Sequence, residues 1–214
     1  MGGTKENILL TALRLFARDG YEAVSVSDIA GALGMTKGAL YKHYRSKRDI
    51  FDHILARMEQ RDAEGAEGHS LPEGTSAEMP EAYAAASLGA LLDYAAAQFR
   101  YWTEDEFAAS FRRMLTLEQY RSAEMQRLYQ QYLVSGPLDY TAELLEAMGF
   151  AQPMETAAEI CAPMFLLYSV YDGAEEKDAA ALLEGCLARV RRTAEKKEEK
   201  RGEKHGRERY HHPP

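Results

Sequence analysis

The sequence has few of the features that mark secreted, membrane or zinc-stabilised proteins. Among 214 residues there are two cysteines, Cys161 and Cys186, too few for a disulfide framework and wrongly spaced for a zinc site. No apolar run approaches the ~20 residues of a membrane-spanning helix. Residues 1–6 lack the basic and then apolar order of a secretory signal. We therefore expect a cytoplasmic protein with no metal, no cofactor and no membrane partner.

The sequence also lacks the strict alternation of apolar and polar residues that a half-buried strand would show. Helical patterns cover almost every ordered stretch, and the region 62–80, rich in Gly, Pro and acids, is expected to be a loop. We expect helices at 4–18, 26–33, 37–43, 47–62, 81–101, 104–117, 121–148, 154–171 and 177–192. Kinks are expected at Gly136-Pro137 and at Pro163. The sequence therefore predicts an all-α fold.

Acidic residues are absent between Asp28 and Asp49, although the whole chain has a net charge of −8. The gap contains a compact basic run at 34–48. Residues 1–60 hold nine Lys or Arg against seven Asp or Glu, whereas residues 61–188 hold seven against twenty-two. Such asymmetry indicates separate tasks for the two regions. The basic run predicts a surface that meets phosphate.

Two short helices flank Gly34-Met35, which is the arrangement of a helix-turn-helix whose second helix enters the DNA major groove. Ser25 and Asp28 form a capping-box pattern, and Thr36 is a good N-cap for the second helix. A helical wheel over 36–44 places Leu40 and Tyr44 toward the core. The opposite face carries small or basic residues that would let the helix sit deep in the groove: Gly38, Ala39 and Lys42.

Groups that can reach DNA surround this helix. Lys37 and Lys42 can meet acceptors on guanine or nearby phosphates, and the helix N-terminus at Thr36 favours a phosphate. Tyr41, His43 and Lys47 are expected to hold flanking phosphates, which fixes register without reading sequence.

Residues 5–55 resemble the N-terminal domain of TetR-type bacterial transcriptional regulators. The residues that carry the resemblance are Ile8, Ala12, Leu15, Phe16, Gly20 and Tyr21, then 25–30, 34–41, Tyr44, Lys47, Ile50 and Phe51. The resemblance implies that Ser25 and Ser27 meet the DNA backbone or a base edge. It also implies that Lys37, Gly38 and Ala39 face bases, while Tyr41, His43 and Lys47 hold phosphates.

This resemblance predicts an N-terminal three-helix helix-turn-helix domain followed by a larger helical ligand-binding and dimerisation domain. We expect the first domain at 1–48 and the second at 49–192, joined by the helix at about 47–62. The Glu-, Lys- and Arg-rich residues 193–214 hold almost no apolar side chains and are expected to form a disordered tail.

The acidic helical region is dense in aromatic residues and Met, which suit a pocket for an apolar or aromatic ligand. The resemblance implies a small-molecule effector bound there. The candidate ligand residues are Tyr94, Phe99, Phe107, Phe111, Met114, Met125, Tyr129 and Tyr168. The alternative is that these residues form an ordinary core.

The last two predicted helices are the candidates for a dimer interface, and the alternative is again an intramolecular core. The first helix contributes Ile160, Met164, Phe165 and Leu167, and the second contributes Leu182, Leu183, Cys186, Leu187 and Val190. A homodimer would also place two recognition helices one helical turn of DNA apart, about 34 Å.

The leading hypothesis is a sequence-specific DNA-binding transcriptional regulator, a homodimeric repressor that a ligand releases from its operator. The alternative is an architectural or cell-division DNA-binding factor that acts through a protein partner without an inducer. An enzyme is disfavoured, because no phosphate-binding loop, metal-ligand set or nucleophile–base series is present at readable spacing.

Overall fold

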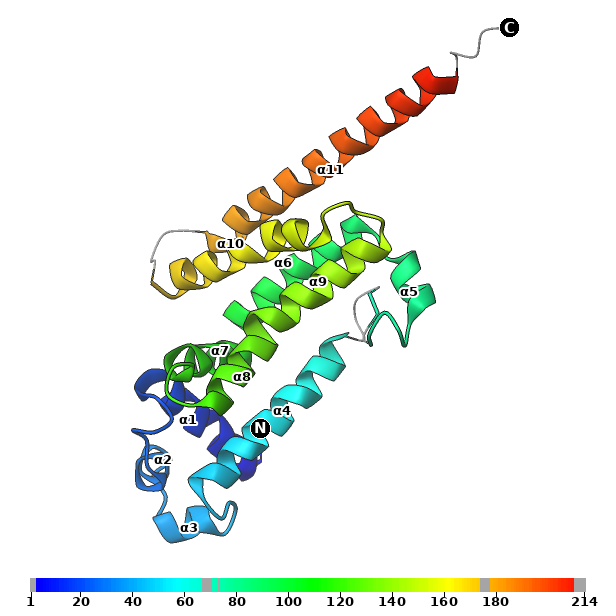
Figure 1. Cartoon of the computed structure of the whole chain (residues 1–214). Helices are drawn as coiled ribbons and strands as arrows, with labels where there is room; N and C mark the ends of the chain where they lie inside the picture. The colour runs from blue at the N-terminus through cyan, green and yellow to red at the C-terminus, as the bar shows by residue number, and fades with distance from the viewer. Residues whose placement is uncertain (1–2, 67–70, 73, 174–177, 210–214) are drawn as a thin grey trace, which may run out of the picture. The chain divides into compact units, whose positions relative to one another are not determined.

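A computed structural model describes residues 3–66, 71–72, 74–173 and 178–209, and these residues form helices without a strand (Figure 1). The prediction of an all-α fold is confirmed. No described helix is both long and apolar enough to cross a membrane. Within the described residues, no group of three or more His, Cys, Asp or Glu could hold a metal ion.

The described helices are numbered in chain order. Their bounds are α1 Thr4–Asp19, α2 Val26–Ala32, α3 Lys37–Tyr41, α4 Lys47–Ala66, α5 Pro80–Ala85, α6 Leu88–Glu104, α7 Glu106–Glu118, α8 Ala123–Leu133, α9 Ser135–Ala147, α10 Pro153–Gly173 and α11 Ala179–Arg209.

The chain divides into two compact units, each made of two separate segments. Unit 1 comprises Met1–Glu73 and Arg100–Pro137, and unit 2 comprises Gly74–Phe99 and Leu138–Pro214. Unit 1 thus holds α1 to α4 together with α7 and α8. The predicted boundary at residue 48 separates two functions rather than two compact units, and it stays a prediction.

The core of unit 1 forms where α1 packs against α7 and α4. Apolar residues spaced three or four apart on α1 and α4 make one buried stripe on each helix. Residues fully buried there are Ile8, Ala12, Leu13, Phe16, Ile50, Phe51, Ile54 and Met58. Burying a side chain of this size stabilises the fold by about 1.5–3 kcal/mol.

In unit 2, α10 packs along α11. Ile160 and Leu167 of α10 and Leu183 and Leu187 of α11 are buried in this unit. The ring of Phe99 stacks on Tyr168 with their centroids 5.2 Å apart. The two helices therefore share an intramolecular core.

Two long helices expected from the sequence are each interrupted. The stretch 81–101 divides because Ala86 is extended (ψ 146°), after which the hydroxyl of Ser87 caps α6 by accepting from Ala90 N–H at 3.2 Å. The stretch 121–148 divides at Val134 (φ −123°, ψ −92°). Pro137 then lies in the first turn of α9, where its missing N–H costs nothing. By contrast, α10 continues through Pro163.

The structure continues α11 to Arg209, beyond the expected helix end at residue 192, and the expected disorder of residues 193–214 stays a prediction. This segment is made largely of Glu, Lys and Arg, which are strong helix formers. The helix thus continues beyond the buried Ala194 even though the sequence that follows offers almost no apolar side chains to bury. Residues 210–214 lie outside the described residues.

Candidate nucleic-acid interface

Local capping fixes both helices of the helix-turn-helix. The Ser25 hydroxyl accepts from Asp28 N–H at 3.2 Å, and the Asp28 carboxylate accepts from Ser25 N–H at 2.8 Å. The Ser25 hydroxyl also donates to the Asp28 carboxylate at 2.6 Å, and this hydrogen bond together with that from the Ser25 N–H lowers the pKa of Asp28. The Thr36 hydroxyl accepts from Ala39 N–H at 3.1 Å and caps α3. Both predicted caps are confirmed.

The turn between α2 and α3 depends on Gly34, whose φ of +64° favours glycine. Met35 N–H donates to the Ala30 carbonyl at 3.0 Å, which closes the end of α2. The direction of α3 is therefore set within a few residues. The helix ends at Tyr41, two residues before the predicted end, a difference usual for helix boundaries.

The two faces of α3 differ as the helical wheel predicted. Leu40 is fully buried and Tyr44, three residues after the helix, is 1% exposed. Tyr44 also donates its hydroxyl to the Lys5 carbonyl at 3.3 Å. A Cβ on Gly38 would meet nothing within 4 Å, so this position leaves open space beside α3.

The predicted DNA-binding residues lie around this open face. Exposed residues are Ser25, Ser27, Thr36, Lys37, Gly38, Tyr41 and Lys42, and half-buried residues are Ala39, His43 and Lys47. The ammonium of Lys37 lies 5.8 Å from the centroid of the Tyr41 ring. Among the residues that the structure describes, neither Lys37 nor Lys42 forms an ion pair.

Lys47 differs from these two lysines because its ammonium is turned toward the end of α1. It donates to the carbonyl oxygens of Tyr21 at 2.8 Å and Glu22 at 3.2 Å. It also lies 4.3 Å from the centroid of the Tyr21 ring. The predicted contact of Lys47 with a phosphate stays a prediction. In the structure its ammonium donates to two backbone carbonyl groups and lies near an aromatic ring.

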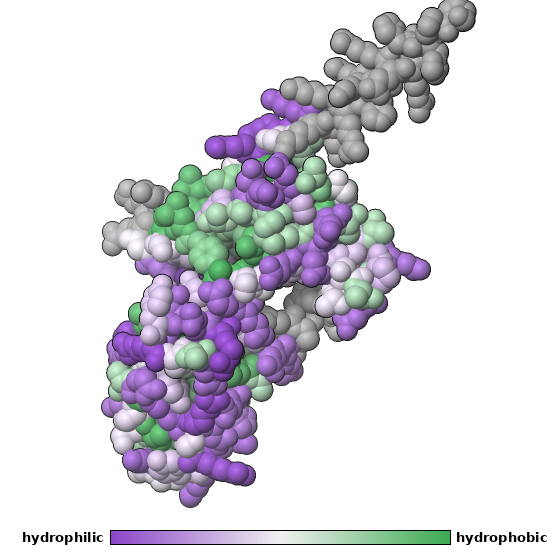
Figure 2. Space-filling model, viewed as in Figure 1, coloured by the Kyte–Doolittle hydropathy of each residue, from purple (hydrophilic) through white to green (hydrophobic). Residues whose placement is uncertain are grey.

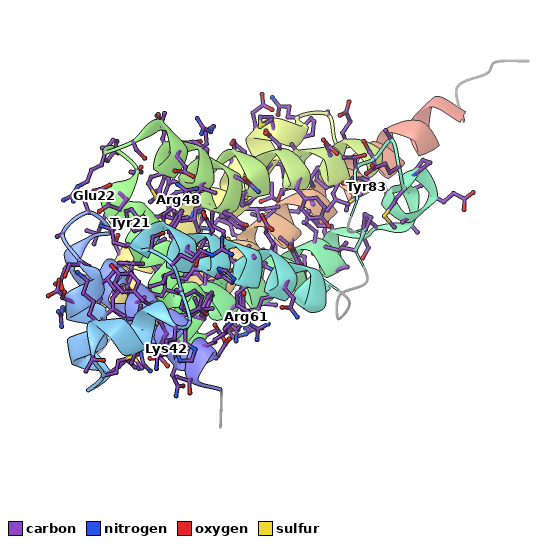
Figure 3. All side chains as sticks on the ribbon, turned by 90° about the horizontal axis from the view of Figure 1, so that it is seen from below. Tyr21, Glu22, Lys42, Arg48, Arg61 and Tyr83 are labelled. Carbon is purple, nitrogen blue, oxygen red and sulfur yellow. The ribbon has the colours of Figure 1, made fainter. Side chains whose placement is uncertain are left out.

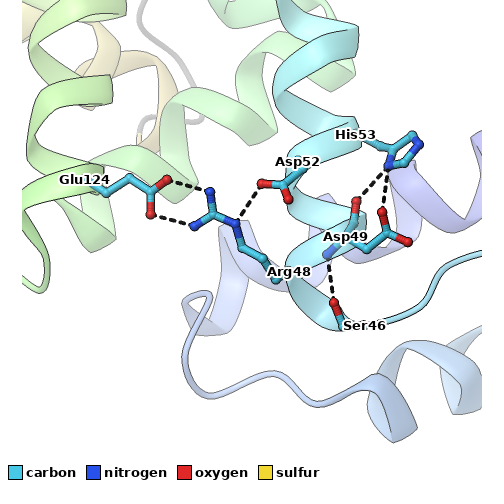
Figure 4. Close-up of polar contacts among 6 residues, drawn as sticks. All are labelled: Ser46, Arg48, Asp49, Asp52, His53 and Glu124. Atoms are coloured by element: carbon cyan, nitrogen blue, oxygen red, sulfur yellow. Dashed lines mark hydrogen bonds and ion pairs between the residues drawn. The ribbon is translucent and has the colours of Figure 1, made fainter.

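The guanidinium of Arg48, at the start of α4, is hydrogen-bonded to two acidic side chains (Figure 4). Its two terminal nitrogens each donate to one carboxylate oxygen of Glu124 on α8 at 2.7 Å, and its Nε donates to Asp52 at 2.7 Å. Hydrogen bonding to Arg48 lowers the pKa of Glu124. Figure 3 shows Arg48 near Tyr21 and Glu22, so this corner of unit 1 also holds the turn after α1.

Sequence reasoning missed Glu118, the last residue of α7. Its carboxylate is 1% exposed and accepts from Tyr21 N–H at 2.9 Å and from Arg121 at 3.2 Å. The Tyr21 partner lies 97 residues earlier in the chain. No local pattern could have indicated this contact, because only the packing of α1 on α7 creates it.

The candidate ligand residues fall into both units. In unit 1, Phe111 contacts Tyr132 edge-to-face with centroids 5.2 Å apart and stacks beside Trp102 at 6.5 Å. The unit 1 candidates are Phe107, Phe111, Met114 and Met125, which are buried, and Tyr129, which is half-buried. The unit 2 candidates are Phe99 and Tyr168, which are buried, and Tyr94, which is half-buried.

The candidate dimer residues differ in exposure. Five are buried within the protomer: Ile160, Leu167, Leu183, Leu187 and Val190. Met164, Phe165 and Cys186 are half-buried, whereas Leu182 is 50% exposed. Leu166 of α10, which is not among these candidates, is 68% exposed. Figure 2 shows hydrophobic surface gathered where α10 lies in Figure 1.

Residues 8–54 match the family model described as bacterial regulatory proteins, tetR family. The regulator AcrR of Shigella flexneri is 45% identical over 51 residues, which are 24% of each chain. The repressor KstR2 of Rhodococcus jostii is 43% identical over 53 residues, 25% of this chain and 26% of the relative. The chain thus matches about a quarter of the length of these curated relatives.

Solved structures extend the likeness of the fold along most of the chain. A TetR/AcrR-family transcriptional regulator of Aquifex aeolicus has a TM-score of 0.61 at 20% identity, over 88% of this chain and 98% of that one. A complex of SmeT with triclosan has a TM-score of 0.58 at 19% identity, over 87% and 91%. Residues 8–54 are thus similar to the bacterial regulatory proteins of the tetR family, and the described residues form an all-helical fold like that of the Aquifex regulator.

Proposed function

We propose that this chain is a sequence-specific transcriptional repressor of the cytoplasm. It binds a double-stranded DNA operator as a homodimer and leaves it when a small apolar or aromatic effector binds. The exposed face of α3 carries the proposal: Lys37, Tyr41 and Lys42 surround the open space at Gly38, while Leu40 is buried. A short capped helix with this division suits insertion into a major groove.

Two kinds of DNA contact follow from the position of each group. Lys37 at the N-terminus of α3 is placed to meet guanine acceptors, which would contribute to sequence reading. Tyr41 and Lys42 at the other end are placed to meet phosphates, which would fix register. The exposed Ser25 and Ser27 at the start of α2 would meet the backbone on the other side of the turn.

The proposed dimer uses the exposed apolar face of α10 and α11. Leu166 and Leu182 are 68% and 50% exposed, and large exposed apolar side chains favour association when they lie together. The half-buried Met164, Phe165 and Cys186 would join them at the interface. Replacing Leu166 and Leu182 by Glu should convert the dimer to a monomer in analytical ultracentrifugation. Glu substitutions at Leu117 and Tyr120, which are also exposed, serve as the matched control and should leave the dimer intact.

The effector is proposed to pack against α7. Phe107, Phe111 and Met114 recur at helical spacing on this helix and are buried in unit 1. The triclosan of the SmeT complex is an aromatic molecule, and such a stripe would suit a ligand of that chemistry. An effector that favours one pose of α7 over another would shift the protein between DNA-binding and released states. Tyr94, Phe99 and Tyr168 stay candidates in unit 2.

The experiment begins with selection of duplexes from a random-sequence library by the full-length chain, followed by footprinting on the selected sequence. Replacing Lys37 and Tyr41 by Ala should abolish protection while the dimer stays intact. Lys196→Ala is the control for loss of an exposed lysine and should leave protection unchanged. Protection that persists in the double variant would refute this assignment of the reading residues.

Effector release is tested on the same duplex with triclosan, a cationic dye and a fatty acid as probes. Phe111→Ala should weaken release by the probe that acts on the unaltered protein. The architectural or cell-division alternative predicts that no small molecule changes the affinity for DNA.

A further inference from the structure

The backbone of Tyr21 is held from both sides at the point where the chain leaves α1. Its N–H donates to the Glu118 carboxylate of α7 at 2.9 Å, and its carbonyl accepts from the Lys47 ammonium of α4 at 2.8 Å. Its ring lies 5.1 Å from each of the rings of Phe16 and Phe51. Three helices of unit 1 therefore meet at the residue that begins the connection to α2.

The Glu118 contact is unusually constrained. The carboxylate is 1% exposed, and a buried charge is costly unless it is hydrogen-bonded and paired. A Cβ on the preceding Gly20 would lie 2.6 Å from Glu118 Oε1, and Gly20 has a φ of +88°. Both the conformation and the close approach thus require glycine beside this carboxylate.

We propose that Glu118 is a positioning residue for DNA recognition. By fixing the N–H of Tyr21, it sets the direction in which α2 and α3 leave the packed pair of α1 and α7. In a homodimer this direction determines the separation of the two recognition helices. The inference rests on the proposed function and assigns to α7 the control of that separation.

Other contacts between helices of unit 1 are poorer candidates for this task. Arg14 pairs with Glu106 at the other end of α7, but both side chains are about half exposed (52% and 56%). The side chains of Arg48 and Glu124 are 53% and 37% exposed. Exposed ion pairs typically contribute little to stability and tolerate rearrangement. The Glu118 contact is buried and acts on the backbone, so a shift there moves the following segment with it.

Glu118 lies on the same helix as the proposed effector site. The buried Phe107, Phe111 and Met114 precede it on the same helix. Glu118 lies four residues after Met114, about one helical turn further on. A ligand that shifts α7 at Phe107, Phe111 and Met114 would therefore also shift Glu118, and with it the contact to the Tyr21 N–H, because all four residues lie on one helix.

The test measures half-site spacing, because a general loss of stability would not change it selectively. The full-length chain is titrated against the library-selected duplex and against duplexes with one base pair added or removed between half-sites. One base pair changes the separation by about 3.4 Å and rotates one half-site by about 35°. The unaltered protein should prefer its own spacing at least tenfold.

Glu118→Ala should reduce this preference to below threefold while binding to a scrambled duplex stays unchanged. Glu118→Gln should restore most of the preference, because its amide oxygen can still accept the Tyr21 N–H. Glu106→Ala removes the exposed acid of the same helix and should keep the preference. If Glu118→Ala does not fold, Glu118→Asp decides, because it keeps the charge but withdraws the carboxylate from Tyr21.

The outcomes separate the inference from the proposed function. A protein that selects no sequence from the library would refute the proposed function. A protein that selects a duplex, but whose Glu118→Ala or folded Glu118→Asp variant keeps the spacing preference, would overturn the inference alone.

Discussion

Lys42 and Lys47 are five positions apart, yet their ammonium groups meet different surroundings. Lys42 follows α3 and is exposed, without an ion pair in the described part of the chain. Lys47 begins α4, is 23% exposed and is bound by two carbonyls and an aromatic ring. The same contrast separates the exposed ring of Tyr41 from the buried ring of Phe51. The side chains of Lys37, Tyr41 and Lys42 are exposed, whereas those of Lys47, Arg48 and Phe51 contact other residues of unit 1.

The largest effect is expected when one aromatic ring from each of the two regions is replaced by Ala. Phe51 is fully buried, so Phe51→Ala should lower the free energy of unfolding by about 3–5 kcal/mol. Tyr41 is 44% exposed, and Tyr41→Ala should change that free energy by no more than about 0.5 kcal/mol. Urea denaturation followed by circular dichroism measures both. Equal losses in the two variants would show that α3 is not a free surface.

Replacing each of the two lysines by Met tests the same contrast, with a smaller expected change in stability. Lys47→Met removes charged donors from two carbonyls and should lower the free energy of unfolding by about 1–2 kcal/mol. Lys42→Met should leave stability unchanged but reduce the slope of log affinity for the selected duplex against log salt by about 1. A similar reduction with Lys47→Met would show that Lys47 also neutralises a phosphate, as the sequence predicted.

The smallest effect concerns the ion pair of Arg48 and Glu124. Hydrogen bonding to Arg48 lowers the folded-state pKa of Glu124, so its contribution is present above the unfolded pKa of about 4.3. That contribution is lost as pH falls through the lowered folded value. Because the side chains are 53% and 37% exposed, it should not exceed about 1 kcal/mol.

Urea titrations of the unaltered protein and of Glu124→Gln at pH 7 and pH 3 measure this contribution. The difference in unfolding free energy should be present at pH 7 and shrink at pH 3. A difference that grows toward acid would reverse the sign that the geometry requires.

Sequence reasoning succeeded where structure is decided by residues close together in the chain. The Ser25–Asp28 and Thr36–Ala39 caps each span three residues, and the burial of Leu40 follows from helical spacing. It failed where a contact joins distant segments. Nothing near Glu118 in the sequence indicates Tyr21.

The positions at which long helices end were also difficult to predict from the sequence. The interruptions at Ala86 and Val134 depend on backbone conformation rather than on a strong breaker at the break itself. At the second break, a Cβ on Gly136 would overlap the Gln131 carbonyl oxygen, so glycine allows the close approach of these two residues. The helix end at residue 192 was placed too early, because the lack of apolar residues after it argues against burial but not against a helix.

The two-segment composition of unit 1 has a consequence for protein engineering. A chimeric regulator made by fusing residues 1–66 to a foreign effector module would lose Glu106, Glu118 and Glu124, which lie in the second segment. The transplanted segment would keep its helix caps and the exposed face of α3 but would lack Glu118, the proposed positioning residue, and the exposed partners of Arg14 and Arg48. A graft that preserves operator choice should therefore carry α7 and α8 with the first four helices, and the junctions belong within α6 and α9.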